Sequence, residues 1–185
     1  MDDFCIDTFS GVLANGPSNG SMFTYYLTSR FPNMFSAVVP VYGQPLINTL
    51  SVPDSLATVD IMHIHDRSDK TIPPSGVSED GWIYMSVNTT LEEWARQKRC
   101  PIQMGFSNFT TPYSGGALNL ECYHKPNCTL SQVFLCWWDG EHGSWDDNTE
   151  ALALWFYRGK YRDYAPIELN KVLDIPSLRV RDDSN

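Results

Sequence analysis

The stretch that decides the fold of this chain is Gly16-Pro17-Ser18-Asn19-Gly20. It has the pattern G-x-S-x-G, in which a serine lies in a sharp turn between a strand and a helix. The flanking sequence fits this arrangement, because an apolar run ends at Ala14 and a helical pattern extends over 20–30. Glycine tolerates the backbone angles that so tight a turn requires. The alternative is an ordinary turn of Gly, Asn and Ser. We predict the sharp turn, with the hydroxyl of Ser18 presented as a nucleophile.

A serine hydroxyl is a weak nucleophile until a base takes its proton, and the base needs a carboxylate to orient it. The sequence contains both groups downstream, in the order serine, acid, histidine. An apolar, β-branched pattern at 59–64 predicts a strand, and the polar loop after it contains Asp66 and Asp69. A later apolar run leads into the turn Asp139-Gly140-Glu141-His142-Gly143. We predict that His142 is the general base and that one of the two carboxylates is its partner.

Several segments carry a resemblance to a known family: Ser18 to Met22, residues 31–43, residues 63–73, residues 80–84, the end of a predicted helix from Trp94 through Cys100, and Trp138 to His142 with Trp145. Together they resemble the polyhydroxybutyrate depolymerase and feruloyl esterase group of secreted α/β-hydrolases, over about residues 5–157. The resemblance implies a serine carboxylic ester hydrolase. It implies Ser18, Asp69 and His142 as the catalytic triad and the backbone N–H of Asn19 as an oxyanion donor. The group usually has glycine at the position of Asp66, so this second carboxylate stays an alternative acid.

The resemblance also implies an α/β fold, the three-layer α/β-hydrolase sandwich with a mainly parallel sheet. The sequence pattern agrees, since strand patterns alternate with helical ones. We predict strands at 12–15, 36–42, 59–65, 118–122 and 132–138, and helices at 20–30, 87–98 and 147–157. Residues 105–116 are rich in Gly, Ser, Thr and Asn, which predicts a loop. We expect a partial catalytic domain over 1–157 and an irregular C-terminal tail over 158–185.

An α/β-hydrolase has several strands before its nucleophile, and one early loop supplies half of the oxyanion hole. Here only a short segment precedes Ser18. We therefore expect the N-terminal strands and the second oxyanion donor to be absent, which leaves the strand at 12–15 as an unpaired edge. The chain is then either a piece of a longer protein or a degenerate copy, and we expect little activity from it alone.

Five cysteines offer disulfide candidates: Cys5, Cys100, Cys122, Cys128 and Cys136. They lack the paired C-x-x-C spacing of zinc sites. Cys122 and Cys136 flank a predicted hairpin, where antiparallel strands bring such positions face to face. Cys100 and Cys128 then remain as a second pair, and Cys5 is left over. The alternative is that these cysteines are small apolar core residues.

Glycosylation candidates of the form N-x-[ST] lie at Asn88, Asn108 and Asn127. Asn19 also fits the pattern, but we expect the sharp turn to bury it. Together with the cysteines, these motifs favour an extracellular protein whose signal peptide is not in this chain, because its first residues are acidic and contain no basic region.

The tryptophans near His142 are candidate substrate-binding residues. Trp137 and Trp138 follow each other in a strand and point to opposite faces, so at most one lines a cleft. We name Trp138 and Trp145. His63 and His65 also share a strand face, and H-x-H followed by a carboxylate is typical of some metal sites. Strand packing explains the pair as well, and with four histidines in the chain we predict no metal and no cofactor.

The composition narrows the partners. The chain has 185 residues, is 42% hydrophobic and carries a net charge of −9, which argues against nucleic-acid binding because such proteins have basic patches. No apolar run is long enough to span a membrane. The expected partner is an ester substrate, either an aromatic acyl-polysaccharide or a polyester. Two alternatives remain open: a non-catalytic binding module of the same fold, and a serine peptidase on that fold.

Overall fold

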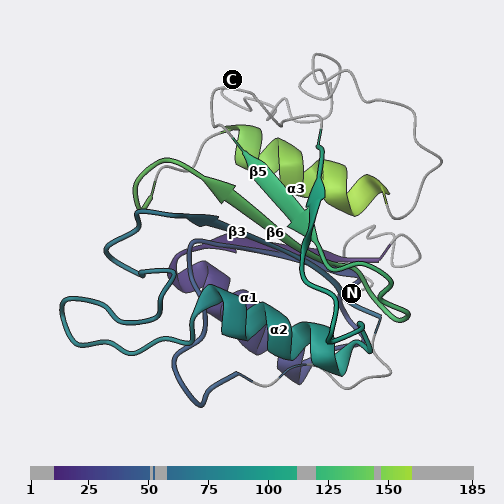
Figure 1. Cartoon of the computed structure of the whole chain (residues 1–185), viewed down its shortest axis with the longest axis horizontal. Coiled ribbons are helices and arrows are strands. Elements are labelled where there is room, and N and C mark those ends of the chain that lie inside the picture. The colour runs from purple at the N-terminus through teal and green to yellow at the C-terminus, as the bar shows by residue number, and fades with distance from the viewer. Residues whose placement is uncertain (1–10, 51, 53–57, 112–119, 144–146, 160–185) are drawn as a thin grey trace, which may run out of the picture.

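The computed structural model describes residues 11–50, 52, 58–111, 120–143 and 147–159. Figure 1 shows them as one sheet between helices. In chain order the elements are β1 (Leu13–Pro17), α1 (Asn19–Arg30), β2 (Ala37–Val41), β3 (Asp60–Asp66), α2 (Val87–Gln97), β4 (Ser107–Phe109), β5 (Glu121–His124), β6 (Val133–Trp138) and α3 (Asp147–Gly159). Cys5, Trp145 and all of the tail predicted over 158–185 except its first two residues, which end α3, lie outside the described residues.

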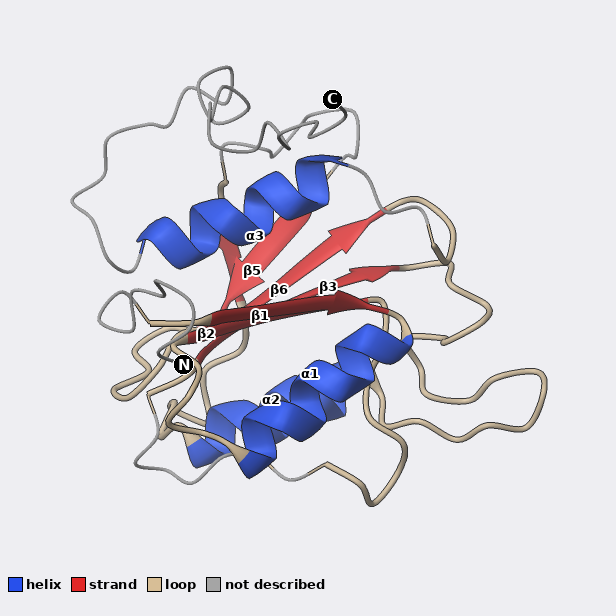
Figure 2. Ribbon diagram, turned by 180° about the vertical axis from the view of Figure 1, so that it is seen from behind, coloured by secondary structure: helices blue, strands red, loops and turns tan. Residues whose placement is uncertain are grey.

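The sheet formed by the described residues has the strand order β1-β2-β3-β6-β5-β4. The pairs β1–β2, β2–β3 and β3–β6 are parallel, whereas β6–β5 and β5–β4 are antiparallel. Helices α1 and α2 cover one face and α3 covers the other (Figure 2). This is a mixed, largely parallel α/β architecture in three layers, as the alternation of strand and helix patterns predicted.

The central strands are buried on both faces, as parallel strands between helices must be. Every residue of β2 and of β3 is buried. Side chains alternate between the faces, so Val38 and Ile61 pack in the α1 and α2 layer while Val39 and Met62 pack in the α3 layer. The two apolar clusters therefore hold the carboxyl ends of β1, β2, β3 and β6 in fixed register, and the loops that leave those ends meet above the sheet.

The boundaries agree closely with the sequence prediction except at the antiparallel edge. β1 lies at one end of the strand order, so among the described residues its outer side has no strand partner. A strand predicted at 118–122 is observed at Glu121–His124. The loop prediction over 105–116 is wrong at Ser107–Phe109, where β4 pairs with β5. These three residues show no alternation of apolar and polar side chains. They form a strand because they pair with β5.

Two disulfides bind the antiparallel edge to the rest of the fold. Cys122 and Cys136 are opposite residues of β5 and β6 and are bonded to each other. Cys100, shortly after α2, is bonded to Cys128 in the turn between β5 and β6. These are the two pairs that the sequence predicted. The first bond lies in the strand that leads to His142, so it also stabilises the position of that loop.

Candidate active site

The turn between β1 and α1 holds Ser18 in a conformation that few residues adopt. Its φ is 52° and its ψ is −119°, outside the regions that suit a residue with a Cβ atom. Such strain persists only where the surroundings enforce it, and it concentrates at functional sites. The enforcing contacts are visible: the N–H of Ser18 donates to the carbonyl of Val41 at 2.9 Å, and the carbonyl of Ser18 accepts from the N–H of Ser21 at 2.9 Å.

The hydroxyl of Ser18 does not serve the helix that it begins. Serine is a preferred N-cap residue because its oxygen accepts from a free helical N–H, and Ser86 does this for α2, accepting from the N–H of Thr89. Ser18 occupies the N-cap position of α1 without any side-chain cap hydrogen bond. Its Oγ lies instead 2.9 Å from Nε2 of His142. A helix start gives up a stabilising contact here, and the hydroxyl faces a base.

The two glycines of G-x-S-x-G are not equivalent. A Cβ atom on Gly16 would lie 2.7 Å from the backbone carbon and oxygen of Gly20, which no real structure tolerates without movement. A Cβ atom on Gly20 would meet only the ring of Pro17, at 3.4 Å, which is an ordinary contact. A third glycine also matters: a Cβ atom on Gly43 would collide with the carbonyl of Ser18. The turn therefore requires glycine at 16 and 43.

This asymmetry gives a testable prediction. Gly16→Ala should lower the free energy of unfolding by about 1–3 kcal/mol, the range for forcing extra atoms into packed structure. Gly20→Ala, the matched control in the first turn of α1, should change it by less than about 1 kcal/mol, because alanine is the better helix former. Urea titration of both variants measures the difference. Equal destabilisation by the two substitutions would contradict the turn geometry described here.

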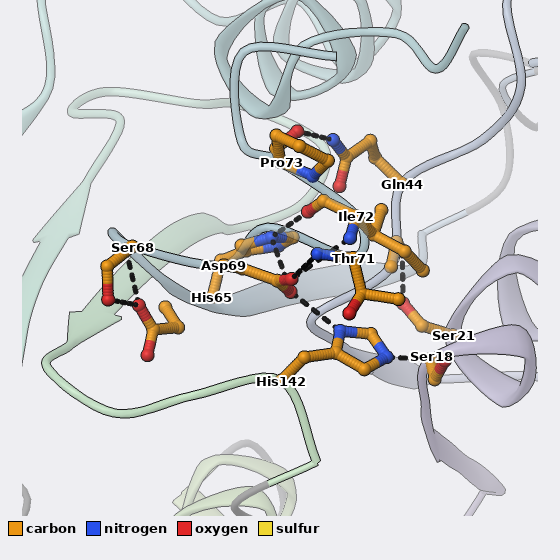
Figure 3. Close-up of polar contacts among 12 residues, drawn as sticks. Ser18, Ser21, Gln44, His65, Ser68, Asp69, Thr71, Ile72, Pro73 and His142 are labelled. Carbon is orange, nitrogen blue, oxygen red and sulfur yellow. Dashed lines mark hydrogen bonds and ion pairs between the residues drawn. The ribbon is translucent and has the colours of Figure 1, made fainter. Parts of the chain in front are cut away.

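Three side chains from distant parts of the sequence meet above the sheet (Figure 3). Ser18 follows β1, Asp69 follows β3 and His142 follows β6. Nδ1 of His142 lies 2.8 Å from Oδ2 of Asp69, and Nε2 of the same ring lies 2.9 Å from Oγ of Ser18. A carboxylate can only accept, so Nδ1 carries the proton and the neutral ring accepts from the serine hydroxyl at Nε2. The arrangement is a serine oriented toward a base that a carboxylate holds.

The carboxylate of Asp69 is buried, and both of its oxygens have hydrogen-bond partners. Its Oδ1 accepts from the N–H groups of Thr71 and Ile72, each at 2.9 Å, and its Oδ2 faces His142. Asp66, the alternative acid, makes hydrogen bonds to other groups. Its Oδ1 accepts from the backbone and the hydroxyl of Ser68, and its Oδ2 accepts from the N–H of Gly140 at 2.6 Å. Asp66 thus fixes the loop that carries His142 but does not contact the ring itself.

Tyr42 is a residue of this site that the sequence prediction missed. It follows β2 with a positive φ of 35°, and its ring meets the ring of His142 edge to face, with the centroids 4.9 Å apart. Burial and the negative charge of Asp69 both raise the pKa of the Tyr42 phenol. An aromatic residue directly before Gly43 was the only signal in the sequence, and nothing there indicated that its ring would support the imidazole.

The substrate-binding role predicted for Trp138 is wrong. Its side chain is 1% exposed and packs edge to face against Tyr42, 5.6 Å between centroids. The last residue of β6 faces the layer under α3, so its indole fills the core beneath the site. Trp137, on the opposite face, is half-buried, with the guanidinium of Arg67 over its ring. Trp145 lies outside the described residues.

The three asparagines predicted as glycosylation sites are all on the surface. Asn88, Asn108 and Asn127 are exposed. The prediction that Asn19 is buried is wrong, since it is exposed as well. It is the first residue of α1, and the sharp turn buries the backbone around Gly16 but leaves this side chain facing outward. The backbone N–H of Asn19 still belongs to the helix N-terminus, where N–H groups have no intrahelical partner.

His63 and His65 do not form a metal site with other residues of the described part of the chain, where no group of three or more candidate ligands occurs. Both rings are fully buried and hydrogen-bonded. Nδ1 of His63 lies 2.7 Å from the hydroxyl of Tyr25, and its Nε2 lies 3.0 Å from Nδ1 of His65. Nε2 of His65 donates to the carbonyl of Ile72 at 2.9 Å. Burial lowers the pKa of His63 and lowers that of His65 to about 4.

These depressed pKa values predict how stability depends on pH. The folded protein keeps His65 neutral down to about pH 4, whereas the unfolded chain takes up a proton near its usual pKa of 6.5. Between these values the unfolded state binds more protons, so stability falls as the pH falls from 6.5 to 4. Between pH 6.5 and 4, the free energy of unfolding measured by urea titration should fall more steeply in the natural protein than in His65→Gln, because glutamine does not titrate. Equal slopes would contradict the prediction.

A cavity of about 350 Å³ lies elsewhere, at the amino ends of β3 and β6. Among its lining residues are Asp60, Phe109, Ser131, Phe134 and Trp155. It is separated from Ser18 by the length of the sheet, since Ser18, Asp69 and His142 all follow the carboxyl ends of their strands. The cavity therefore does not belong to the candidate site.

Among the described residues, no helix combines the length and the apolar character needed to cross a membrane. No family model matches the sequence, and no curated protein matches it. The structure is similar to that of an acetyl xylan esterase from Aspergillus awamori, with a TM-score of 0.58 and 14% sequence identity. The match covers 84% of this chain and 62% of that chain. At this identity the likeness establishes the fold alone: an α/β fold that an esterase also has.

Proposed function

We propose that this chain carries the catalytic triad of a serine carboxylic ester hydrolase on an α/β-hydrolase fold. The observation that carries the proposal is the continuous chain of hydrogen bonds from Ser18 through His142 to Asp69. The strained backbone of Ser18 and its unused capping position support it. The similarity of fold to an acetyl xylan esterase is in keeping with it.

The proposed reaction proceeds in two halves. Oγ of Ser18 attacks the ester carbonyl carbon while Nε2 of His142 takes the hydroxyl proton. Asp69 holds the ring and stabilises its positive charge. The C–O bond of the ester then breaks, and the leaving alkoxide takes the proton from His142. Water, deprotonated by the same ring, attacks the acyl-serine and releases the carboxylic acid and the free hydroxyl.

The negative oxygen of each tetrahedral intermediate needs hydrogen-bond donors. The backbone N–H of Asn19 is the donor we propose, since it lies at the N-terminus of α1, where the free N–H groups and the helix dipole favour negative charge. We propose no second donor among the described residues.

The proposed substrates are esters of aromatic acids on polysaccharides, acetylated polysaccharides, or polyesters of hydroxy acids. The first and last follow from the feruloyl esterase and polyhydroxybutyrate depolymerase resemblance, and the second from the fold neighbour. Two disulfides among the described residues favour an extracellular site of action, because such bonds persist in oxidising compartments. The exposed asparagines at 88, 108 and 127 are proposed glycosylation sites.

The proposal is tested by offering the purified protein p-nitrophenyl acetate, methyl ferulate, acetylated xylan, poly-3-hydroxybutyrate and a peptide p-nitroanilide. We expect slow release of alcohol or acid from at least one ester and none from the peptide, with turnover unchanged by a chelator. Cleavage of the peptide alone would favour the peptidase. A folded protein that turns over no ester would favour the binding module, and either outcome overturns the proposal.

A further inference from the structure

We propose that Tyr25, His63 and His65 form a buried hydrogen-bond relay that positions the loop bearing Asp69, so that His65 is a positioning residue for the triad. The inference rests on the proposed function. Its tests are chosen to give an answer whether or not the protein hydrolyses esters.

The direction of every hydrogen bond in the relay follows from its last acceptor. The carbonyl of Ile72 can only accept, so Nε2 of His65 carries a proton. A neutral ring then has a bare Nδ1, which accepts from Nε2 of His63 at 3.0 Å. The Nδ1 of that second ring is bare in turn and accepts from the hydroxyl of Tyr25 at 2.7 Å. All three bonds run one way, from α1 through β3 to the loop.

The relay ends on the residue that also binds the acid. The carbonyl of Ile72 accepts from His65, and the N–H of Ile72 donates to Oδ1 of Asp69 at 2.9 Å. Nε2 of His65 itself lies 3.6 Å from Oδ2 of Asp69, the oxygen that faces His142. The carboxylate is therefore held between the imidazole of the triad and the end of the relay, as Figure 3 displays.

Burial makes the relay rigid. Tyr25 is 3% exposed and both histidines are 0% exposed, and the two imidazoles stack with centroids 5.2 Å apart. Trp94 of α2 meets the ring of Tyr25, and Trp137 of β6 meets that of His65. Buried polar groups of this kind cost stability unless every bond is made. Apolar side chains would fill the same space without that requirement, so a purely structural account leaves the chosen residues unexplained.

Other groups near His65 do not disturb its neutral form at ordinary pH. The charged and titratable groups that act on it are Asp66, Asp69 and His142, together with His63 in direct contact. Desolvation by burial is the largest effect and lowers the pKa of His65; the hydrogen bond to Ile72 and the charges of Asp69 and Asp66 raise it, and His142 lowers it. A second proton on His65 would turn its Nδ1 from an acceptor into a donor and break the relay at its centre.

The first test measures tautomers. Nitrogen-15 NMR of the purified protein at pH 7 should give neutral rings protonated at Nε2 for both His63 and His65, and the four histidines of the chain can be assigned by single substitution. A neutral ring protonated at Nδ1, at either position, would overturn the relay. This measurement needs no substrate, so it fails or succeeds independently of ester hydrolysis.

The second test compares His65→Gln with His65→Met. The amide of glutamine can donate to the carbonyl of Ile72, whereas methionine fills similar space without a donor. We expect His65→Met to lower kcat by ~10²-fold with KM changed less than about threefold, the scale of a misplaced catalytic group. His65→Gln should retain kcat within about tenfold. Equal kcat in folded protein of both variants would overturn the proposal.

A third readout covers the cases of lost folding or absent turnover. The proton between Nδ1 of His142 and Asp69 should give a strongly downfield NMR signal in the natural protein. Tyr25→Phe, which removes only the hydroxyl that donates to Nδ1 of His63, should shift that signal while both histidines keep their protons at Nε2 and the melting curve stays cooperative. An unchanged signal in Tyr25→Phe would overturn the proposal. If the protein hydrolyses no ester but this signal is present and shifts in Tyr25→Phe, only the proposed function is overturned.

Discussion

Ser18→Ala should lower kcat for p-nitrophenyl ester hydrolysis by on the order of 10⁶-fold, the loss seen when the nucleophile of a serine hydrolase is removed. The reason is local. The Oγ atom that faces Nε2 of His142 at 2.9 Å is the atom that bonds to the substrate, and alanine has nothing in its place. The substitution removes no cap hydrogen bond from α1, so the free energy of unfolding should change little.

The matched control for this prediction is Ser29→Ala. Ser29 lies near the other end of α1, and its hydroxyl donates to the carbonyl of Tyr26. It should keep turnover within about twofold and stability within ~0.5 kcal/mol. Substantial turnover by Ser18→Ala would exclude it as the nucleophile, and an equal loss in both variants would point to damage to the helix rather than to the chemistry.

Asp69→Asn should lower kcat by ~10⁴-fold. An amide in place of the carboxylate presents either an oxygen or an N–H to Nδ1 of His142, and it cannot stabilise the imidazolium that forms during attack. Asp66→Asn is the natural comparison, because Asp66 ends β3 and Asp69 lies in the loop that follows it. It weakens the hydrogen bonds to Ser68 and to the N–H of Gly140 but leaves the ring's partner intact, so we expect a loss of roughly tenfold or less.

Comparing Asp69→Asn with Asp66→Asn also tests the alternative that the sequence left open, in which Asp66 is the acid. If Asp66 were the acid, Asp66→Asn would show the larger loss and Asp69→Asn the smaller. Steady-state kinetics of both variants with the same ester, together with their melting curves, decide between the two assignments.

The sequence predicted the parts of the fold that repeat a strong local pattern. The apolar runs of β2, β3 and β6, the glycine turn before α1 and the facing pair Cys122 and Cys136 all follow from pattern and spacing. β4 could not be predicted, because Ser107–Phe109 is three residues long and becomes a strand only through β5. Its existence depends on tertiary pairing and not on propensity.

The site was predictable in outline but not in detail. Ser18 and His142 each lie in a loop that the sequence marks with glycine. Asp66 and Asp69 lie three residues apart, at the end of β3 and in the loop after it, and only the fold of that loop decides which carboxylate faces the ring. Trp138 was misassigned for a similar reason: a strand pattern tells that neighbours point to opposite faces, but not which face lies under the site.

The relay of Tyr25, His63 and His65 shows the same limit at longer range. The sequence placed the two histidines on one face of a strand, which suggested metal ligands or packing. That Tyr25 of α1 reaches them, and that the other end reaches Ile72, depends on how α1 packs against β3 and on where the loop returns. Neither is contained in any local pattern.

The most direct test of the central claim is to treat the purified protein with a fluorophosphonate, which bonds only to a serine that a base has activated, and to locate the label by peptide mass spectrometry. The account predicts one label, on Ser18, that is lost in Ser18→Ala and strongly slowed in His142→Ala. A folded protein with no label, or with a label at Ser18 whose rate does not depend on His142, would contradict it.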